Sequence, residues 1–272
     1  MPSPIGWLDR IVSKDGSSHR IATGVSFGVH PLLKLDLYAP RRPAGPLPLL
    51  IFVYGGGWDS GDRRDYDFAG RALAALGFLV AIPGYRVFPE VRFPDFVEDI
   101  ADAAKWLAEH APIYGGDRKR LFLGGHSAGA YNAMMVALQP ARFGAPGLAG
   151  TIKGVVGLSG PYDFYPFDVK QSIDAFGQSS DPEGTQPINL VTAHSPPMLL
   201  IHGERDRTVG DYHTVRLAQK LRALGVPVTE RHYARLTHPM TLLGLMRPLR
   251  RVLPVWADVA AFLRAAINQT GI

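Results

Sequence analysis

The chain contains no cysteine among its 272 residues. This absence excludes disulfides, thiolate metal sites and a cysteine nucleophile, although it leaves the compartment open. No stretch of about 18 apolar residues occurs, so we expect no membrane span. The opening residues 1–16 lack a charged start followed by a long apolar run, which predicts the absence of a signal peptide and a cytoplasmic location.

Charged residues are also few, at 19% of the chain, and the positive ones are spread thinly despite a net charge of +5. Their densest group, at 247–251, lies inside an apolar region, and no motif that reads nucleic acid accompanies it. We therefore predict no nucleic-acid partner. Metal-ligand patterns such as His-x-His, and the glycine patterns of phosphate and dinucleotide sites, are missing too, so we predict no metal and no cofactor.

The chain does contain a regular alternation of short apolar runs and longer amphipathic stretches. This alternation is typical of an α/β fold in which helices cover both faces of a mostly parallel sheet. With 46% hydrophobic residues, the chain is long enough for one such domain over residues 1–272. We expect strands at 34–40, 47–55, 77–85, 120–126, 152–160, 197–203 and 228–233, and helices at 64–76, 95–111, 128–139 and 212–224.

Two segments interrupt this alternation. Residues 1–33 precede it and are expected to form an N-terminal flap or hairpin, with a strand at 19–29. Residues 160–196 are rich in aromatic residues, Pro, Ser and Gly and contain no long helical pattern, which predicts a short lid-like insertion. The apolar C-terminal region, 238–267, is expected to form a helix on the sheet, with a homodimer interface as the alternative.

The sequence LGGHSAGAYN at 123–132 places Ser127 in the pattern Gly-x-Ser-x-Gly. The pattern follows an apolar strand and leads directly into a helix of small residues, which is the context of a nucleophile elbow. Gly125 and Gly129 permit the tight turn, in which the serine adopts a strained backbone conformation at the carboxyl edge of the sheet. An ordinary glycine-rich loop has no need of this strand and helix. We therefore predict that Ser127 is a nucleophile.

A serine nucleophile needs a base and an orienting carboxylate, which in this kind of fold follow in the order Ser, acid, His. Asp206 comes just after the strand at 197–203 and is the predicted acid, because open parallel sheets place their sites at the carboxyl ends of strands. His238 follows the strand at 228–233 and is the predicted base. The rivals that we interpret as structural residues are Glu204, Asp211, His194, His202, His213 and His232.

The sequence YGGGW at 54–58 follows the strand at 47–55, so its glycines also emerge at the carboxyl edge. Glycines leave backbone N–H groups free to approach a developing oxyanion. We predict an oxyanion hole formed by the N–H groups of Gly55, Gly56 and Ala128. A triple glycine alone would fit a phosphate site or a flexible loop equally well, but its pairing with the elbow favours the oxyanion hole.

The motifs YGGGW, YRVFPEVRFP, YGGD, GGHSAGA, HGERDRTV and THP occur here in the order found in α/β-hydrolases of the esterase and lipase type. From about Lys34 onward the chain resembles bacterial carboxylesterases of the hormone-sensitive-lipase-like and feruloyl- or acetyl-esterase-like groups. It is also similar to kynurenine formamidases in the segment of glycines and Trp. The family usually begins its oxyanion loop with His, whereas this chain has Tyr54.

The motifs and the resemblance together predict a serine carboxylesterase that hydrolyses small to medium acyl esters through an acyl-enzyme on a Ser-His-Asp triad. The predicted partner is a small-molecule ester. Aromatic residues near the sheet edge are candidates for the pocket wall, namely Trp58, Tyr85, Tyr162, Phe164 and Phe167. Two alternatives stay open: an arylformamidase or other amide-cleaving hydrolase with the same machinery, and a non-catalytic binding protein on the same fold.

Overall fold

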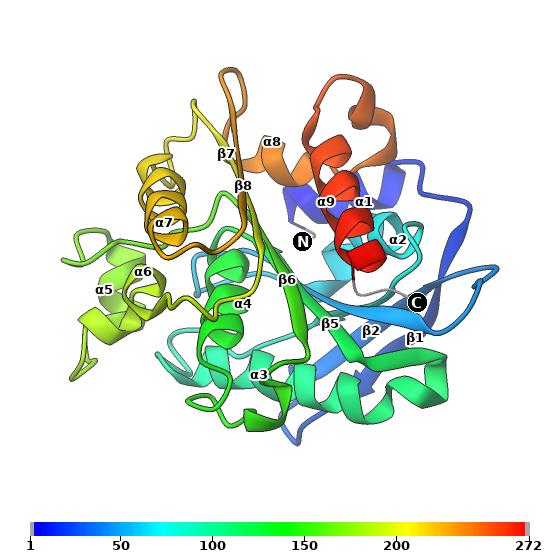
Figure 1. Cartoon of the computed structure of the whole chain (residues 1–272), viewed down its shortest axis with the longest axis horizontal. Coiled ribbons are helices and arrows are strands. Elements are labelled where there is room, and N and C mark those ends of the chain that lie inside the picture. The colour runs from blue at the N-terminus through cyan, green and yellow to red at the C-terminus, as the bar shows by residue number, and fades with distance from the viewer. Residues whose placement is uncertain (1–2, 270–272) are drawn as a thin grey trace.

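A mixed β-sheet crosses the molecule in the computed structural model, which describes residues 3–269 (Figure 1). Within these residues the strand order is β1-β2-β4-β3-β5-β6-β7-β8. β2 is antiparallel to both β1 and β4, and the remaining pairs are parallel, which confirms the predicted sheet. The strands are β1 (Ser18–Ser26), β2 (Lys34–Pro40), β3 (Leu47–Val53), β4 (Leu79–Pro83), β5 (Gly116–His126), β6 (Ile152–Leu158), β7 (Met198–Gly203) and β8 (Val228–Tyr233).

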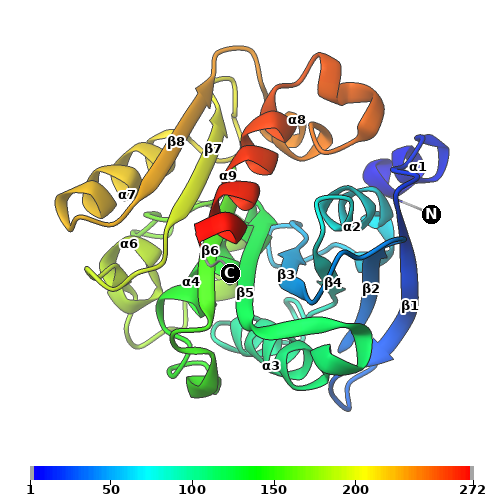
Figure 2. The ribbon, with the colours of Figure 1, turned by 45° about the vertical axis from the view of Figure 1, so that its right-hand side comes forward.

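Helices cover both faces of this sheet, with α2 and α9 on one face and α3, α4 and α7 on the other (Figure 2). Helix α9 packs on β6 and β7, as expected for the apolar C-terminal region. In the described chain, no helix combines the length and the apolar character that crossing a membrane requires. The helices are α1 (Pro4–Ile11), α2 (Asp67–Ala74), α3 (Asp95–His110), α4 (Ala128–Leu138), α5 (Lys170–Phe176), α6 (Pro187–Leu190), α7 (Tyr212–Ala223), α8 (His238–Leu243) and α9 (Val255–Gln269).

Burial separates the central strands from the edge strands. β3 and β7 are buried along their whole length, because helices cover both faces, and their sequences are nearly continuous apolar runs. The edge strands β1 and β8 are largely half-buried. β5 begins at Gly116, before the predicted start at 120, because the polar residues at 116–120 extend the strand beyond the core.

The N-terminal segment contains a helix that the sequence analysis did not predict. The Ser3 hydroxyl accepts a hydrogen bond from the Gly6 N–H at 3.0 Å, and Pro4 occupies the first helical position of α1. The described residues 3–33 contain one strand, β1, which pairs with β2 beyond the expected segment, so the hairpin expected within residues 1–33 is not formed there. Between 160 and 196, the described chain forms only the short helices α5 and α6 and one 3₁₀ turn.

The turn between β5 and α4 depends on two glycines. A Cβ atom on Gly125 would lie 2.5 Å from the carbonyl of Gly129. A Cβ atom on Gly129 would lie only 2.2 Å from the carbonyl oxygen of Val53 at the end of β3. The first turn of α4 therefore rests directly on the backbone of β3, and no side chain fits between them.

We expect Gly129→Ala to lower the free energy of unfolding by roughly 1–3 kcal/mol or more, because the new methyl group meets backbone that cannot move aside. Urea denaturation measures this loss. Gly147→Ala is the matched control, since a Cβ atom there meets nothing within 4 Å. Equal stability losses in the two variants would show that the close approach of α4 to β3 does not constrain the fold.

Candidate active site

The loops that leave the carboxyl ends of β3, β5, β7 and β8 converge at one edge of the sheet. They carry, in this order, the glycines after Tyr54, the serine elbow, Asp206 and His238. Ser127, His238 and the three glycines of the first loop line a single cavity of about 660 Å³. The topology thus brings together segments that lie far apart in the sequence.

Ser127 forms the bend between β5 and α4 and has φ 56° and ψ −128°. This is a conformation that L-residues other than glycine rarely adopt, and such strain concentrates at functional sites. The Ser127 N–H is bonded to the carbonyl of Leu158 in β6 at 2.9 Å, which holds the bend in place. The side chain is therefore presented at the N-terminal end of α4, as the pattern predicts.

Asp206 and His238 form a direct pair. The Nδ1–H of His238 donates to Oδ2 of Asp206 at 2.6 Å, and the carboxylate side chain has no solvent exposure. The other carboxylate oxygen accepts hydrogen bonds from the N–H groups of Thr208 and Val209, both at 2.9 Å. With its proton on Nδ1, the His238 imidazole has Nε2 available as a base.

A second histidine supports this carboxylate. His202, the penultimate residue of β7, is fully buried, and its Nε2 lies 3.3 Å from Asp206 Oδ2 and 2.9 Å from the carbonyl of Val209. Burial alone would raise the pKa of Asp206, but the hydrogen bonds from His202, His238 and the Val209 N–H outweigh it and hold this pKa well below its usual range. Asp206 is therefore a fixed negative charge beneath the imidazole.

In the described chain, the other rivals for the acid and the base make no hydrogen bond or ion pair with Asp206 or His238. Glu204 is exposed, and His194 lies in an exposed loop. His232, on the edge strand β8, bonds to Glu230 at 2.8 Å and lies 3.8 Å from Asp211. The interpretation of these four residues as structural stays a prediction. His213, by contrast, lines the cavity.

Tyrosines support the loop that carries the three glycines. Tyr54 stacks on Tyr85, with ring centroids 4.6 Å apart, and its hydroxyl accepts the Tyr85 N–H at 3.3 Å. The Tyr85 hydroxyl in turn donates to the Tyr54 carbonyl at 3.1 Å. Burial raises the pKa of all three tyrosines here, including Tyr66, so their hydroxyls stay protonated. At the position where the family usually has His, Tyr54 thus ties the loop to the end of β4.

One predicted oxyanion donor needs correction. The Gly55 N–H already donates to the hydroxyl of Tyr66, at 3.4 Å, so it is not free for a ligand. The N–H groups of Gly56 and Gly57 have no acceptor within residues 3–269, and both glycines line the cavity. Ala128 also lines it, at the start of α4, where helix geometry leaves N–H groups without an intrahelical partner.

The aromatic wall of the cavity is only partly as predicted. Trp58 and Phe164 line it, and their rings stack at 5.7 Å. Tyr85 and Tyr162 are instead fully buried and do not line the cavity. Tyr85 stacks on Tyr54 at the start of the glycine loop, and Tyr162 packs against Gly157 and Gly160. Phe167 packs behind Phe164, with ring centroids 5.9 Å apart, and does not line the cavity either.

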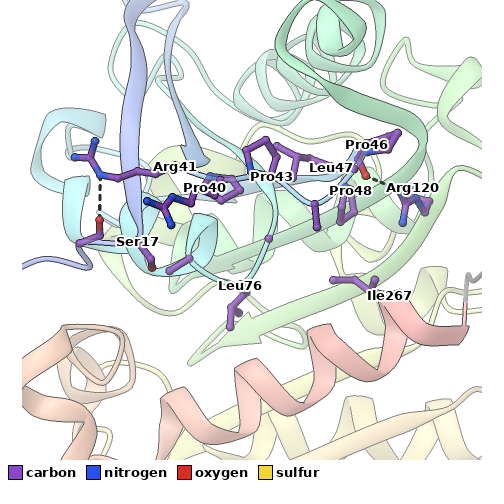
Figure 3. A pocket seen from close by; sticks show the side chains of 16 residues that line it. Ser17, Pro40, Arg41, Pro43, Pro46, Leu47, Pro48, Leu76, Arg120 and Ile267 are labelled. Atoms are coloured by element: carbon purple, nitrogen blue, oxygen red, sulfur yellow. Dashed lines mark hydrogen bonds between the residues drawn. The ribbon is translucent and has the colours of Figure 1, made fainter.

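A second cavity, of about 710 Å³, lies at the opposite edge of the sheet (Figure 3). It is lined mainly by prolines and apolar residues, together with Arg41, Arg42 and Arg120. Two of these arginines bond to protein oxygens: Arg41 to Gly16 and Arg120 to Pro46. Among the described residues that line this cavity, none is a histidine or a carboxylate, so it offers no acid–base pair.

A protein-family model matches residues 35–221, and the description of that family is BD-FAE. The matched region contains the glycine loop, the serine elbow and Asp206. The chain belongs to the BD-FAE family. His238 lies beyond the matched region and is placed in the site by the geometry described above.

Curated relatives carry esterase names. The chain is 30% identical to a probable isoprenylcysteine alpha-carbonyl methylesterase of Oryza sativa subsp. japonica, over 86% of this chain and 61% of the relative. It is 31% identical to Esterase LipC of Mycobacterium tuberculosis, over 74% of this chain and 55% of the relative. The chain thus spans about three fifths of the length of the curated relatives it matches. The predicted resemblance to kynurenine formamidases stays a prediction.

Solved esterase structures share the fold. A thermostable esterase from Pseudomonas putida ECU1011 is 25% identical, with a TM-score of 0.74 over 94% of this chain and 85% of that one. Esterase B from Lactobacillus rhamnosis, inhibited by a tributyrin phosphonate, is 21% identical, with a TM-score of 0.85 over 97% of this chain and 91% of that one. These similarities confirm the predicted α/β-hydrolase fold.

Two buried histidines beside the site make stability depend on pH. Burial lowers the pKa of His126 to about 3 and that of His213 to about 4, in each case with a further contribution from a neighbouring histidine. In the unfolded chain both groups take up a proton near pH 6.5. Between about pH 6.5 and pH 4 the unfolded state therefore binds more protons than the folded state, and stability falls as the pH falls.

We expect the free energy of unfolding to decrease by up to ~1.4 kcal/mol per pH unit for each of these two histidines as the pH falls from about 6.5 towards 4. Chemical denaturation across this range measures the slope. His213→Asn keeps an acceptor for the Tyr162 and Asp163 N–H groups but removes the titration, so the slope should fall by up to ~1.4 kcal/mol per pH unit. The exposed His194→Gln is the control, and an unchanged slope in His213→Asn would contradict the assignment.

Proposed function

We propose that this protein is a serine carboxylesterase in which Ser127 is the nucleophile, His238 the general base and Asp206 the orienting acid. The observation that carries the proposal is the 2.6 Å hydrogen bond between His238 Nδ1 and Asp206 Oδ2, on the wall of the cavity that Ser127 also lines. The esterase names of the relatives support ester cleavage over amide cleavage.

In this mechanism Ser127 Oγ attacks the ester carbonyl carbon while His238 Nε2 takes the hydroxyl proton. The tetrahedral intermediate collapses when the imidazolium returns this proton to the leaving alcohol, and the acyl group stays on Ser127. Water then attacks the acyl-enzyme with the same imidazole as base, which releases the carboxylic acid. The buried Asp206 carboxylate stabilises the imidazolium in both steps.

The oxyanion formed in both steps would bind at the N–H groups of Gly56, Gly57 and Ala128. Gly56 and Ala128 are donors that the sequence predicts. Gly57 replaces the predicted Gly55, whose N–H donates to the Tyr66 hydroxyl. Removing one such donor lowers kcat by about 10²–10³ in enzymes of this kind. These donors lie on a glycine loop and at a helix start that pack on each other, so they need little reorganisation during the reaction.

The cavity supports the proposed substrate class. A volume of about 660 Å³, with Trp58 and Phe164 on its wall, fits small to medium acyl groups. The lid-like segment 160–196 contributes to this wall through Phe164 and Val169.

We expect rates with p-nitrophenyl acetate, butyrate, octanoate and palmitate to pass through a maximum at short or intermediate acyl length, because the cavity limits the size of the acyl group. A maximum at palmitate would contradict this size limit.

We expect Ser127→Ala and Asp206→Asn to lower kcat for p-nitrophenyl butyrate by about 10⁴ or more, because the first loses the nucleophile and the second the correct imidazole tautomer. Steady-state assays measure the loss of kcat, and labelling by a fluorophosphonate probe measures the reactivity of the serine. Ser17→Ala, at the cavity on the opposite sheet edge, is the matched control and should react like the wild type. Full activity in Ser127→Ala, or faster turnover of N-formylkynurenine than of every ester, would contradict the proposal.

A further inference from the structure

His126 occupies the position directly before the nucleophile, and the mechanism above gives it no role. It is the last residue of β5, and only 4% of its surface is exposed. Its Nε2 lies 3.0 Å from the backbone carbonyl oxygen of His238. The two imidazole rings contact each other, with centroids 4.7 Å apart and planes tilted by 49°.

The carbonyl partner fixes the tautomer of His126. A carbonyl oxygen only accepts, so the proton of the neutral ring is on Nε2 and this N–H donates to His238. Burial and the neighbouring charge of His238 lower the pKa of His126 to about 3. The other titratable groups that act on it are Asp206 and His202. His126 therefore stays neutral beside an imidazole that becomes charged during the reaction.

The His238 carbonyl accepts a second hydrogen bond, from the hydroxyl of Thr241 at 3.0 Å. Thr241 lies in α8 and is itself bonded to Ser159, at the end of β6, at 2.9 Å. Ser159 has a positive φ of 50°, and Ser127 likewise has a positive φ, of 56°. The His238 carbonyl is thus bonded to His126 at the end of β5 and to Thr241 in α8, and Ser159 after β6 supports Thr241.

The glycine loop meets the same residue. A Cβ atom on Gly55 would lie 3.0 Å from the carbonyl oxygen of His126, 3.2 Å from its Nδ1 and 3.0 Å from Cβ of Ser127. His126 is therefore covalently joined to the nucleophile, packed against the loop of the oxyanion donors and hydrogen bonded to the main chain of the base. His126 thus contacts all three segments.

We propose that His126 is a positioning residue, which holds the general base at a fixed distance from the nucleophile and the oxyanion loop through its hydrogen bond to the His238 main chain. This inference rests on the proposed esterase function. A shift of the base by about 1 Å can lower the rate of such a reaction by about 10²-fold. Loss of the bond should thus lower kcat and leave substrate binding nearly intact.

The test compares His126→Leu with His126→Gln. Leucine fills a similar volume without a donor, whereas the glutamine amide nitrogen can reach the His238 carbonyl and restore the hydrogen bond. We expect His126→Leu to lower kcat for p-nitrophenyl butyrate by about 10- to 100-fold, with KM changed less than about twofold. Fluorophosphonate labelling of Ser127 should slow by a similar factor. His126→Gln should recover most of both losses.

A spectroscopic readout separates positioning from folding. The His238 Nδ1–H that donates to Asp206 at 2.6 Å should give a far-downfield proton resonance. We expect this resonance to broaden or disappear in His126→Leu and to persist in His126→Gln, since only the donor differs. Circular dichroism and the melting temperature establish that both variants are folded.

Thr241 provides a second pair if His126→Leu does not fold. Thr241→Val removes the other donor to the His238 carbonyl at nearly constant volume, and Thr241→Ser keeps it. We expect the valine variant to show a smaller loss of kcat of the same kind, and the serine variant to resemble the wild type.

The inference is overturned if His126→Leu and His126→Gln share the same kcat, labelling rate and downfield resonance, or if they differ only in melting temperature. Equal kcat values in Thr241→Val and Thr241→Ser would also overturn it. An inactive wild type that the probe does not label is a different result, because it removes the esterase function on which the inference rests. The resonance comparison distinguishes the two failures, since it requires no substrate.

Discussion

The site depends on the direct packing of the first turn of α4 on the end of β3. Because the backbone of Gly129 touches the carbonyl of Val53, α4 must start within one residue of the sheet, and Ser127 takes up the sharp change of direction with a positive φ. The same contact places the glycine loop after β3 beside Ser127. The segments that carry the proposed nucleophile and the proposed oxyanion donors thus meet through a single packing contact.

Electrostatics in the site rest on one buried carboxylate. Asp206 has no exposed side-chain surface, yet it stays ionised because imidazole and backbone N–H groups compensate for its lost hydration. Burial keeps His126 and His213 neutral near the same loop, so the carboxylate acts on His238 without competition from further positive charge. This arrangement makes the stability of the fold sensitive to acid, because both buried histidines can take up protons once the chain unfolds.

Tyrosines hold the glycine loop in place. The resemblance to esterases and lipases leads us to expect His at the position of Tyr54, and here the ring and hydroxyl of this tyrosine join the loop to Tyr85 after β4. Tyr66, just before α2, then holds Gly55. Backbone donors need a loop held in one conformation, and these tyrosine contacts hold it.

The sequence alone predicted the mostly parallel sheet, the sharp bend at Ser127 and the loop positions of Asp206 and His238. Local patterns indicate these features: apolar runs of strand length, glycines at fixed spacing, and polar residues just after strands. It did not predict that the Gly55 N–H donates to Tyr66 or that Tyr85 and Tyr162 are buried away from the cavity. Nor did it predict the hydrogen bond from His126 to the His238 carbonyl. Those facts depend on contacts between segments distant in the chain, and only packing of the loops at the sheet edge decides which donor meets which acceptor.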